Sequence, residues 1–407
     1  MAAGAVATTR RRGLPDRRRS VEADRQASTW RQPGGAAYQT GPSSGDRKTR
    51  RPGRRETLEP SRLFVASHPR GSPRPAPQGA VFPLRAAGGA VNLPQPRPPL
   101  EIHRSPDALA ALGPAYLAAG VFDGVHLGHR AVIGRAVADA GREPGAAVVV
   151  VTFDPHPLRV LRPDAAPRLL TSTAHKFQYF AALGATHCLA LPFDETFAAT
   201  PPEDFITALA RAARPLREIC VGFNWTFGRA GAGNLDLLTR LGERHGFAVV
   251  GLPSVSVDGE TVSSTLIRQA VEAGDLARAA RFLGREFTIL GTVVAGQKLA
   301  RQLGFPTANL AAHNEQFPPN GVYAVEAAWR GEKYPGVVNL GHRPTVAAPG
   351  GERVLELHLF DFERDLYGED VEVSFRAFLR PERKFAGVEE LRAQIARDAE
   401  QARALAK

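Results

Sequence analysis

The sequence predicts an α/β domain with a doubly wound, nucleotidyltransferase-like parallel sheet, followed by a small antiparallel β-barrel with a C-terminal helix. Three observations predict this fold class. Between residues 99 and 284, short apolar runs alternate with helical stretches. After residue 284, apolar runs follow one another with Gly and Pro clusters between them. Residues 1–98 carry neither pattern, and we expect them to be a disordered Pro/Arg-rich extension.

Four apolar runs predict the strands of the parallel sheet. They cover residues 147–153, 187–191, 218–222 and 247–251. The first of them reads Ala-Val-Val-Val-Val-Thr-Phe, which suits a strand covered on both faces. Helices are predicted between the runs at 129–140, 203–213 and 234–245. Alternation of strand and helix is typical of parallel, right-handed crossovers.

The second half predicts short antiparallel strands and a terminal helix. The strands are expected at residues 287–294, 322–329, 335–340, 353–362 and 371–379. Several strands in succession, separated by turn residues, favour a small barrel. The helix, from about 388 to 405, carries Leu391, Ile395 and Ala402 on one face, and this face could cap the barrel.

The positive charge of the chain is confined to its beginning. The whole sequence has a net charge of +11, yet the first 100 residues alone hold 19 Arg and Lys against 6 Asp and Glu, with 14 of the 33 prolines. A basic nucleic-acid-binding protein is the rival interpretation. It rests on this segment alone, because the remainder is close to neutral. The segment could also be an arm for nucleic acid or a membrane surface, or lie upstream of the true start of translation.

Several classes of protein are excluded by composition. No apolar run is long enough to cross a bilayer, and the N-terminus has small residues before its arginines, the wrong order for a secretory signal. Two cysteines exclude a disulfide scaffold and a cysteine-rich zinc module. We therefore expect a cytoplasmic protein that binds neither a membrane nor a specific nucleic acid.

The first candidate site is the segment 120–129, which reads Gly-Val-Phe-Asp-Gly-Val-His-Leu-Gly-His before a predicted helix. His126 and His129, together with the free N–H groups of the helix, would form a site for phosphate oxygens. Gly128 between them lets the backbone approach a ligand closely. Such a site can hold a triphosphate and stabilise charge at an α-phosphorus. The alternatives are surface histidines or an incomplete metal pair.

A second segment, 263–268, reads Ser-Ser-Thr-Leu-Ile-Arg at a predicted helix start. Its hydroxyls can cap the helix and bind phosphate, and Arg268 falls one turn into it. An ordinary cap with a solvent-facing arginine is the alternative. Ligands of doubly wound domains gather at the ends of parallel strands, which favours the functional interpretation.

Four segments in order, 120–129, 152–157, 222–233 and 263–268, resemble the adenylyltransferase half of bacterial bifunctional riboflavin kinase/FMN adenylyltransferases (FAD synthetases). The second reads Thr-Phe-Asp-Pro-His-Pro and the third Gly-Phe-Asn-Trp-Thr-Phe-Gly-Arg-Ala-Gly-Ala-Gly. The resemblance implies that His126 and His129 are catalytic. The ATP-binding residues that it implies are Gly124, Gly128, Asn224, Ser263, Ser264, Thr265 and Arg268.

The same resemblance places Asn224 near Mg2+ as well, and His156 and Phe227 near the flavin. Trp225 stands where the family usually has phenylalanine, so an aromatic ring is kept. For Phe227 and Trp225 the alternative is a plain role in the core.

The second candidate site begins in the segment 291–310. Gly296 lies in a loop whose N–H groups could approach phosphates, and Thr307 and Asn309 offer neutral oxygens suited to Mg2+ beside a nucleotide. An everyday Pro-Thr-x-Asn turn is the alternative. The string Gly-Phe-Pro-Thr-Ala-Asn at the end of this segment resembles the riboflavin kinase signature. The resemblance implies that Gly296, Thr307 and Asn309 bind ATP and that Thr307 and Asn309 also bind the metal.

Two later segments agree with it. Residues 336–345 resemble the Asn-Ile-Gly-x-Arg-Pro-Thr segment of riboflavin kinases, and 355–362 resemble their Glu-x-His strand. Glu356 alternates with leucines, so it and His358 share one face, which is costly inside a barrel unless paired or functional. A solvated face is the alternative. Transfer to an alcohol needs a carboxylate that accepts the hydroxyl proton, and the resemblance makes Glu356 this base.

The resemblance covers residues 100 to 405 and implies a bifunctional enzyme. Residues 99–284 would be the FMN adenylyltransferase domain and 285–407 the riboflavin kinase domain. The first reaction would phosphorylate riboflavin to FMN with MgATP, and the second would join FMN to AMP from another ATP, giving FAD and pyrophosphate. The expected partners are therefore riboflavin, FMN and ATP, with Mg2+ as cofactor. A chain with one inactive half is the alternative within the same family.

Overall fold

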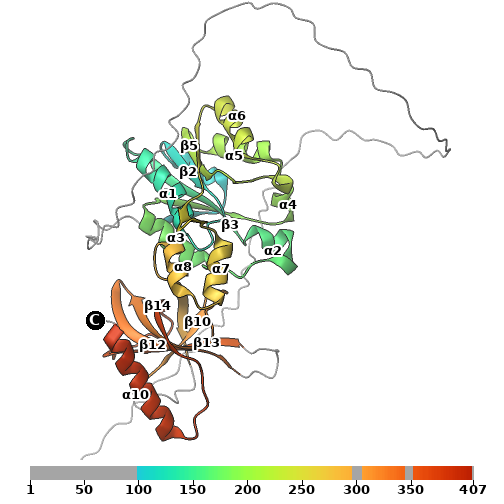
Figure 1. The fold of residues 1–407 in the computed structure, drawn as a ribbon. Coiled ribbons are helices and arrows are strands. Elements are labelled where there is room, and N and C mark those ends of the chain that lie inside the picture. Colours follow the sequence, from blue (N-terminus) through green and yellow to red (C-terminus); the bar gives the residue numbers. More distant parts are fainter. Residues whose placement is uncertain (1–98, 296–304, 344–351, 406–407) are drawn as a thin grey trace, which may run out of the picture. The chain divides into compact units, whose positions relative to one another are not determined.

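The computed structural model describes residues 99–295, 305–343 and 352–405 (Figure 1). Within these ranges, the fold class predicted from the sequence is confirmed: a parallel α/β sheet is followed by a closed antiparallel barrel and a long helix. The disorder predicted for residues 1–98 concerns a segment outside the described residues.

The sheet contains six parallel strands in the order β1-β4-β3-β2-β5-β6. The strands are β1 (Glu101–His103), β2 (Ala115–Ala119), β3 (Ala147–Asp154), β4 (His187–Pro192), β5 (Leu216–Gly222) and β6 (Ala248–Leu252). The chain adds β3 and β4 on one side of β2, and β5 and β6 on the other. The strand order therefore reverses between β2 and β5, and such switch points are where doubly wound sheets bind ligands.

Helices cover both faces of this sheet. Those of the α/β domain are η1 (Pro106–Ala111), α1 (Leu127–Ala140), α2 (Pro157–Leu161), η2 (Pro163–Ala165), α3 (Thr173–Leu183), α4 (Glu195–Ala198), α5 (Pro202–Ala212), η3 (Arg229–Gly231), α6 (Leu235–His245), α7 (Ser264–Glu272) and α8 (Leu276–Leu283). A two-stranded hairpin, β7 (Ser256–Val257) and β8 (Glu260–Thr261), precedes α7. Successive residues of β3 alternate between two apolar clusters, with Val149 in one and Val150 in the other. Both faces are thus buried, as the run of valines predicts.

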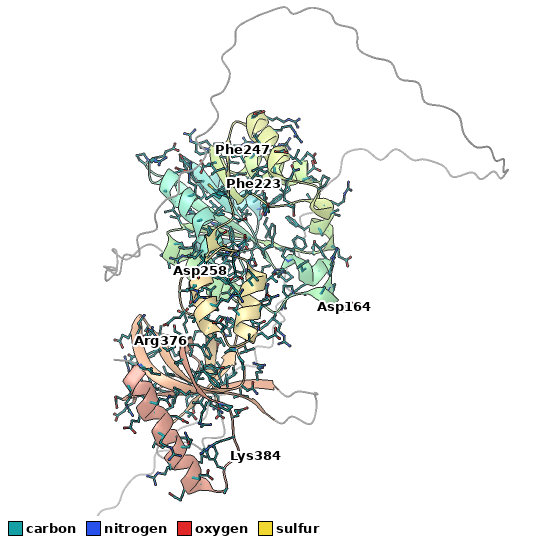
Figure 2. The ribbon with its side chains drawn as sticks, viewed as in Figure 1. Asp164, Phe223, Phe247, Asp258, Arg376 and Lys384 are labelled. Atoms are coloured by element: carbon teal, nitrogen blue, oxygen red, sulfur yellow. The ribbon has the colours of Figure 1, made fainter. Side chains whose placement is uncertain are left out.

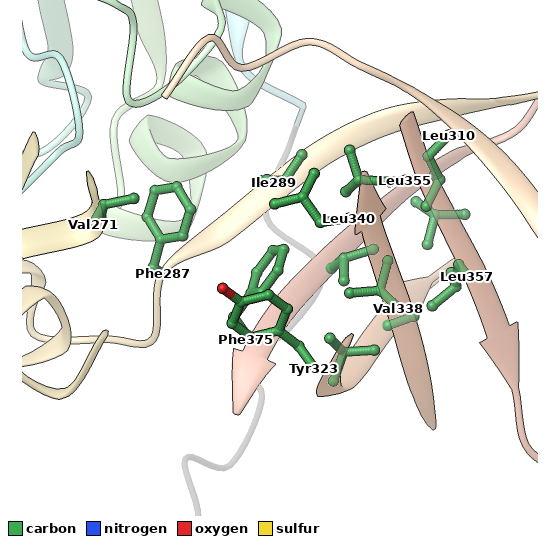
Figure 3. Close-up of a cluster of buried hydrophobic side chains, with 14 of the residues drawn as sticks. Val271, Phe287, Ile289, Leu310, Tyr323, Val338, Leu340, Leu355, Leu357 and Phe375 are labelled. Atoms are coloured by element: carbon green, nitrogen blue, oxygen red, sulfur yellow. The ribbon is translucent and has the colours of Figure 1, made fainter. Parts of the chain in front are cut away.

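The barrel closes in the order β10-β13-β12-β11-β14-β9, with every neighbouring pair antiparallel. Its strands are β9 (Thr288–Val294), β10 (Ala308–Ala312), β11 (Gly321–Trp329), β12 (Glu332–Arg343), β13 (Glu352–Leu359) and β14 (Asp370–Arg380). Five of them match the predicted strands. The sixth, β10, was not expected from the sequence as a strand. Apolar side chains fill the interior, among them Ile289, Leu310, Tyr323, Val338, Leu340, Leu355, Leu357 and Phe375 (Figure 3).

The predicted terminal helix is present as α10 (Val388–Leu405), which packs on the outer wall of the barrel. Ala399 and Ala402 are buried against side chains of β11 and β12, such as Val322 and Val337. Of the three residues expected on the buried face, Ala402 is buried, whereas Leu391 and Ile395 are half-buried. No helix in the described ranges combines the length and apolar character needed to span a membrane.

Candidate active sites

Residues predicted to bind ATP or the flavin lie where central strands of the parallel sheet end. The loop after β2 carries His126, the loop after β3 carries His156, and the turn after β5 carries Asn224. Because these strands are parallel, their carboxyl ends lie at the same edge of the sheet. β2 and β5 are neighbours across the switch point, so the first and third sequence motifs are brought to one place by the topology.

The two histidines of the first motif are in direct contact. His126 is the N-cap of α1, and its Nδ1 accepts a hydrogen bond from the backbone N–H of His129 at 3.4 Å. The two rings are stacked with centroids 3.5 Å apart and planes inclined by 18°. A Cβ at Gly128 would lie 3.2 Å from Cε1 of His126, so glycine gives the stacked rings room. The local sequence thus builds a compact imidazole pair at a helix N-terminus.

Both imidazoles are neutral at pH 7. Burial, followed by the charge of Arg285, lowers the pKa of His126 to about 4. Burial and the neighbouring ring of His126 hold the pKa of His129 well below its usual value. Since Nδ1 of His126 accepts a hydrogen bond, its proton sits on Nε2, which is a donor. The pair therefore offers a phosphate hydrogen-bond donors rather than positive charge. The buried Nδ1 of His129 has no partner among the described residues.

Asp123 connects the histidine loop to the serine-rich motif. Its carboxylate is 3% exposed, accepts hydrogen bonds from the N–H groups of Leu170 at 3.2 Å and Thr171 at 3.0 Å, and forms an ion pair with Arg268. The hydroxyl of Ser264 donates to the backbone carbonyl of Asp123 at 2.9 Å. The first and fourth sequence motifs are therefore in contact. Sequence reasoning did not single out Asp123, although it stands inside the first motif.

Gly124 has a structural reason to be glycine. Its φ is +82°, and a Cβ there would lie 2.8 Å from a methyl carbon of Leu170. Its N–H donates to the hydroxyl of Thr171 at 2.9 Å. A side chain at this position would be strained and would collide with Leu170, so this turn before the histidines requires glycine.

The other residues of the fourth motif differ in how they are held. The hydroxyl of Ser263 accepts the N–H of Leu266 at 3.3 Å, as an ordinary cap of α7 does. Thr265 is exposed. Besides its ion pair, Arg268 donates through Nε to the carbonyl of Arg168 at 2.7 Å. Arg268 is thus anchored by protein groups rather than facing solvent freely, and it lies beside the loop that carries the histidine pair.

Two cations near the histidine loop, the half-buried Arg285 and the buried Lys176, were not predicted from the sequence. Arg285 donates to the carbonyls of Gly124 at 2.8 Å and Val125 at 3.0 Å, and its guanidinium lies 3.9 Å from the ring centre of Tyr179. Lys176 is buried, and burial lowers its pKa. Both supply positive charge beside the loop. Neither lies in a motif, because the contacts are made between segments far apart in the chain.

The residues expected near the flavin lie at the same edge of the sheet. His156 caps α2 by accepting the N–H of Leu158 at 3.2 Å through Nδ1, and burial lowers its pKa. Phe227 is 5% exposed and belongs to an apolar cluster, which favours the core alternative for this residue in the ligand-free protein. Trp225 stacks on Phe227 with ring centres 4.6 Å apart. Phe223, labelled in Figure 2, is 62% exposed; it belongs to the third sequence motif, and no role was predicted for it.

In the barrel, three polar residues lie side by side on neighbouring strands. Asn309 on β10 is the register partner of Glu356 on β13, which in turn is the partner of Asn339 on β12. Asn309 is buried and Glu356 is half-buried. The leucines that flank Glu356 belong to the barrel core. Glu356 and His358 therefore share a face, as the alternation predicts, and this face is the outer wall of the barrel rather than its interior.

His358 holds the Pro-Thr segment against β13. Its Nδ1 donates to the carbonyl of Pro306 at 2.8 Å, and the ring packs edge-on against Phe305 with centroids 5.6 Å apart. Burial lowers the pKa of His358. The half-buried Thr307 is thereby placed directly before β10 and Asn309. Gly296 lies outside the described residues, as does the end of the Arg-Pro-Thr segment.

The candidate site on the barrel contains both oxygen ligands for a metal and a proton acceptor. The hydroxyl of Thr307 and the amide of Asn309 are hard oxygen donors of the kind that Mg2+ prefers. The carboxylate of Glu356 lies on the adjoining strand and can accept a proton. These groups suit transfer of a phosphoryl group to an alcohol, whereas the α/β site combines imidazole donors with nearby cations and a helix N-terminus.

Comparisons with known proteins match the two parts of the chain separately. A family model described as FAD synthetase matches residues 109–266, and one described as riboflavin kinase matches residues 283–406. The bifunctional riboflavin kinase/FMN adenylyltransferase of Escherichia coli (strain K12) is 41% identical over 69% of this chain and 90% of that protein. The protein of the same name from Pseudomonas fluorescens is 39% identical over 70% of this chain and 91% of its own length.

A solved structure shares the fold over most of the chain. The protein from Streptococcus pneumoniae, whose title names it a macrolide-efflux protein, gives a TM-score of 0.63 at 28% identity. It is matched over 74% of this chain and 98% of that chain.

Proposed function

This chain belongs to the family of bifunctional riboflavin kinase/FMN adenylyltransferases, and from that premise we propose which residues carry each of its two reactions. The enzyme phosphorylates riboflavin to FMN with ATP, and it adenylylates FMN with a second ATP to give FAD and pyrophosphate. One observation supports the assignment of the reactions to residues: the range matched by each family model contains one of the two candidate sites. The His126–His129 pair lies in the FAD synthetase match and Glu356 in the riboflavin kinase match. We accordingly propose domains at 99–284 and 285–407.

In the kinase reaction, Glu356 is the catalytic base. Its carboxylate accepts the proton of the ribityl 5′-hydroxyl as the alcohol oxygen bonds to the γ-phosphorus, and the bond to the β-phosphate oxygen breaks to release ADP. Thr307 and Asn309 would hold Mg2+, which neutralises phosphate charge when bound. Gly296 would let backbone N–H groups approach the phosphates. His358 positions this segment through its hydrogen bond to Pro306.

In the adenylyl transfer, no strong base is required, because the FMN phosphate is already anionic near neutral pH. A phosphate oxygen of FMN attacks the α-phosphorus of ATP, and pyrophosphate leaves. His126 and His129 donate hydrogen bonds to the phosphate oxygens, assisted by the N–H groups of α1. Stabilisation by neutral donors suits a site whose positive charge is supplied by Arg285 and Lys176 nearby.

The remaining ATP contacts of this site surround the histidine pair. We assign them to Gly124, Gly128, Ser263, Ser264, Thr265 and Arg268, and we assign Asn224 to both ATP and Mg2+. Asn224 is an exposed residue just after β5, and an amide oxygen is chemically suited to this ion. For the flavin, we assign His156 and Phe227, the latter acting together with the Trp225 ring stacked on it.

We further propose that the enzyme works in the cytoplasm and that neither reaction involves nucleic acid or a membrane. The support is chemical, because riboflavin, FMN and ATP are small molecules and both candidate sites are built from residues after position 100.

Labelled ATP tests the proposal directly. The full chain is incubated with riboflavin, Mg2+ and ATP carrying a radioactive phosphorus at either the γ or the α position, and flavins are separated by chromatography. The γ label is expected in both FMN and FAD, and the α label in FAD alone. In a parallel reaction, a chelator of divalent cations should stop the formation of FMN and FAD, and excess Mg2+ should restore it, which tests the requirement for a metal. Absence of the γ label from FMN, or of the α label from FAD, would overturn the corresponding half.

A further inference from the structure

A cluster of metal-ligating side chains lies on the parallel sheet, away from both proposed sites. Glu101 and His103 belong to β1, the edge strand, and His187 is the first residue of β4, its neighbour. Glu101 is the register partner of His187. Because side chains two residues apart on a strand point to the same side, His103 joins them. The nucleotide motifs follow the carboxyl ends of their strands, whereas His187 stands at the amino end of β4.

The spacing of the ligand atoms is that of a small tetrahedral ion site. Nε2 of His103 lies 3.2 Å from Nδ1 of His187, and a carboxylate oxygen of Glu101 lies 3.7 Å from the same nitrogen. One ligand atom from each residue can be chosen such that all lie within 4.8 Å of one another. Two ligands bound to zinc at about 2.0–2.1 Å in tetrahedral geometry are about 3.3 Å apart. The two ring nitrogens therefore already have the separation that zinc requires.

We propose that Glu101, His103 and His187 bind one divalent transition-metal ion of the zinc class, with a solvent molecule as the fourth ligand. Two imidazole nitrogens and one carboxylate favour zinc over Mg2+, which prefers oxygen. The side chain of Glu101 is 66% exposed and that of His187 is 13% exposed, so an ion can enter from the Glu101 side. The ion would fasten a three-residue edge strand to β4.

The competing interpretation uses the same distances. One neutral imidazole can donate an N–H to the other, with ring centres 5.3 Å apart and planes inclined by 25°. A hydrogen bond of this kind needs no metal and leaves Glu101 in solvent. Metal binding and a simple hydrogen bond make opposite predictions for titration with zinc.

The test uses the full chain after removal of metals with a chelator. Zinc is titrated in competition with a chromogenic chelator, for the wild type and for the variants His103→Gln, His187→Gln and Glu101→Gln. The matched control is His245→Gln, a half-buried histidine of α6 whose Nε2 lies 3.2 Å from the Thr207 hydroxyl. One tightly held equivalent is expected in the wild type and the control. It should be lost in both cluster histidine variants and weakened in the glutamate variant.

Two further readouts make the outcome decisive. Zinc should raise the melting temperature of the wild type and the control but not of His103→Gln. Cobalt should give the strong visible absorption of tetrahedral coordination in the wild type alone among the cluster proteins. The proposal would be overturned if the wild type took no zinc from the chromogenic chelator, or if His103→Gln bound as much zinc as the wild type. If His187→Gln fails to fold, the zinc titrations of the edge-strand variants His103→Gln and Glu101→Gln still test the proposal.

Discussion

His126 and His129 are neutral because burial dominates their surroundings and the cations nearby act in the same direction. Nδ1 of His126 is occupied by the cap of α1, so its neutral ring presents one N–H to a ligand, and the proposed contribution of the pair is that of oriented dipoles. The stacked geometry and the cap of α1 fix this orientation before any ligand arrives. Preorganised donors of this kind contribute most where charge develops in the transition state.

The depressed pKa of His126 predicts a pH dependence of stability. In the folded protein this pKa is about 4, below the usual 6.5 of an unfolded chain. The stabilisation is therefore fully present above pH 6.5 and is lost as the pH falls toward 4. Between pH 7.5 and 5.0 the wild type should lose about 2 kcal/mol more unfolding free energy than His126→Gln. Urea denaturation at the two pH values measures this difference, and equal losses would show that His126 is not buried as a neutral group.

Glu356 is the residue on which the kinase assignment depends. Replacing it with glutamine keeps the shape of the side chain and removes the proton acceptor. Formation of FMN from riboflavin should fall by about a hundredfold or more, whereas conversion of supplied FMN to FAD should stay within about twofold. Initial rates of both reactions measure the effect. Glu363→Gln, at an exposed position just beyond β13, is the control, and a Glu356→Gln protein as active as this control would disprove the role.

At the scale of elements, α10 is fastened to the barrel by one buried ion pair. Asp398 accepts hydrogen bonds from Nε of Arg380 at 3.0 Å and from Nη2 at 2.8 Å, and its side chain is 5% exposed. Asp398→Ala would leave the Arg380 guanidinium, whose side chain is 18% exposed, without its partner. The barrel should lose about 2–4 kcal/mol of stability.

Thermal unfolding of Asp398→Ala, followed together with kinase activity, measures this loss. Glu400→Ala, at an exposed position of the same helix, should leave the melting temperature unchanged. Equal melting temperatures for the two variants would show that α10 is held by its apolar face alone.

The sequence predicted those elements whose own residues carry a strong pattern. The valine run of β3 and the capped helices α1 and α6 were predicted within a few residues. Five strands were missed. β1 has three residues, β7 and β8 have two each, and β2 and β10 are rich in alanine, which has weak strand propensity. β1, β2 and β10 are specified by their pairing with distant segments rather than by local sequence.

The same distinction applies to the sites. The motifs identified the histidine pair and the Glu356 strand, because each motif is contiguous. Asp123 and Arg285 were missed as organisers, since their partners lie far along the chain; Arg285 contacts a carbonyl 161 residues earlier. The burial of Phe227 was likewise decided by tertiary packing against Phe205, which no local spacing shows.

For the molecule as a whole, the basic extension should be dispensable. It contributes no residue to either proposed site, because the first motif begins at position 120 and β1 begins at Glu101. Its composition, rich in Arg and Pro, offers little apolar surface to a core. Deletion of residues 1–95 should leave both activities and the melting temperature unchanged.

Activity assays and thermal melts of the truncated and full chains test this expectation. Loss of flavin turnover, or a markedly lower melting temperature, would show that the extension contributes to the folded enzyme and that the boundary near residue 98 is wrong.

The central claim is that two reactions are carried by two separate sites, and complementation between inactive variants tests it most directly. With riboflavin and MgATP, Glu356→Gln alone should form almost no FMN and therefore almost no FAD. His129→Ala alone should accumulate FMN, which also shows that its barrel is folded. Mixed together, the two proteins should form FAD, because FMN made by one diffuses to the adenylylating site of the other. A mixture that makes FMN but no FAD, while Glu356→Gln still adenylylates supplied FMN, would contradict independent sites joined by a freely diffusing intermediate. FAD formation by His129→Ala alone would contradict the assignment of the histidine pair.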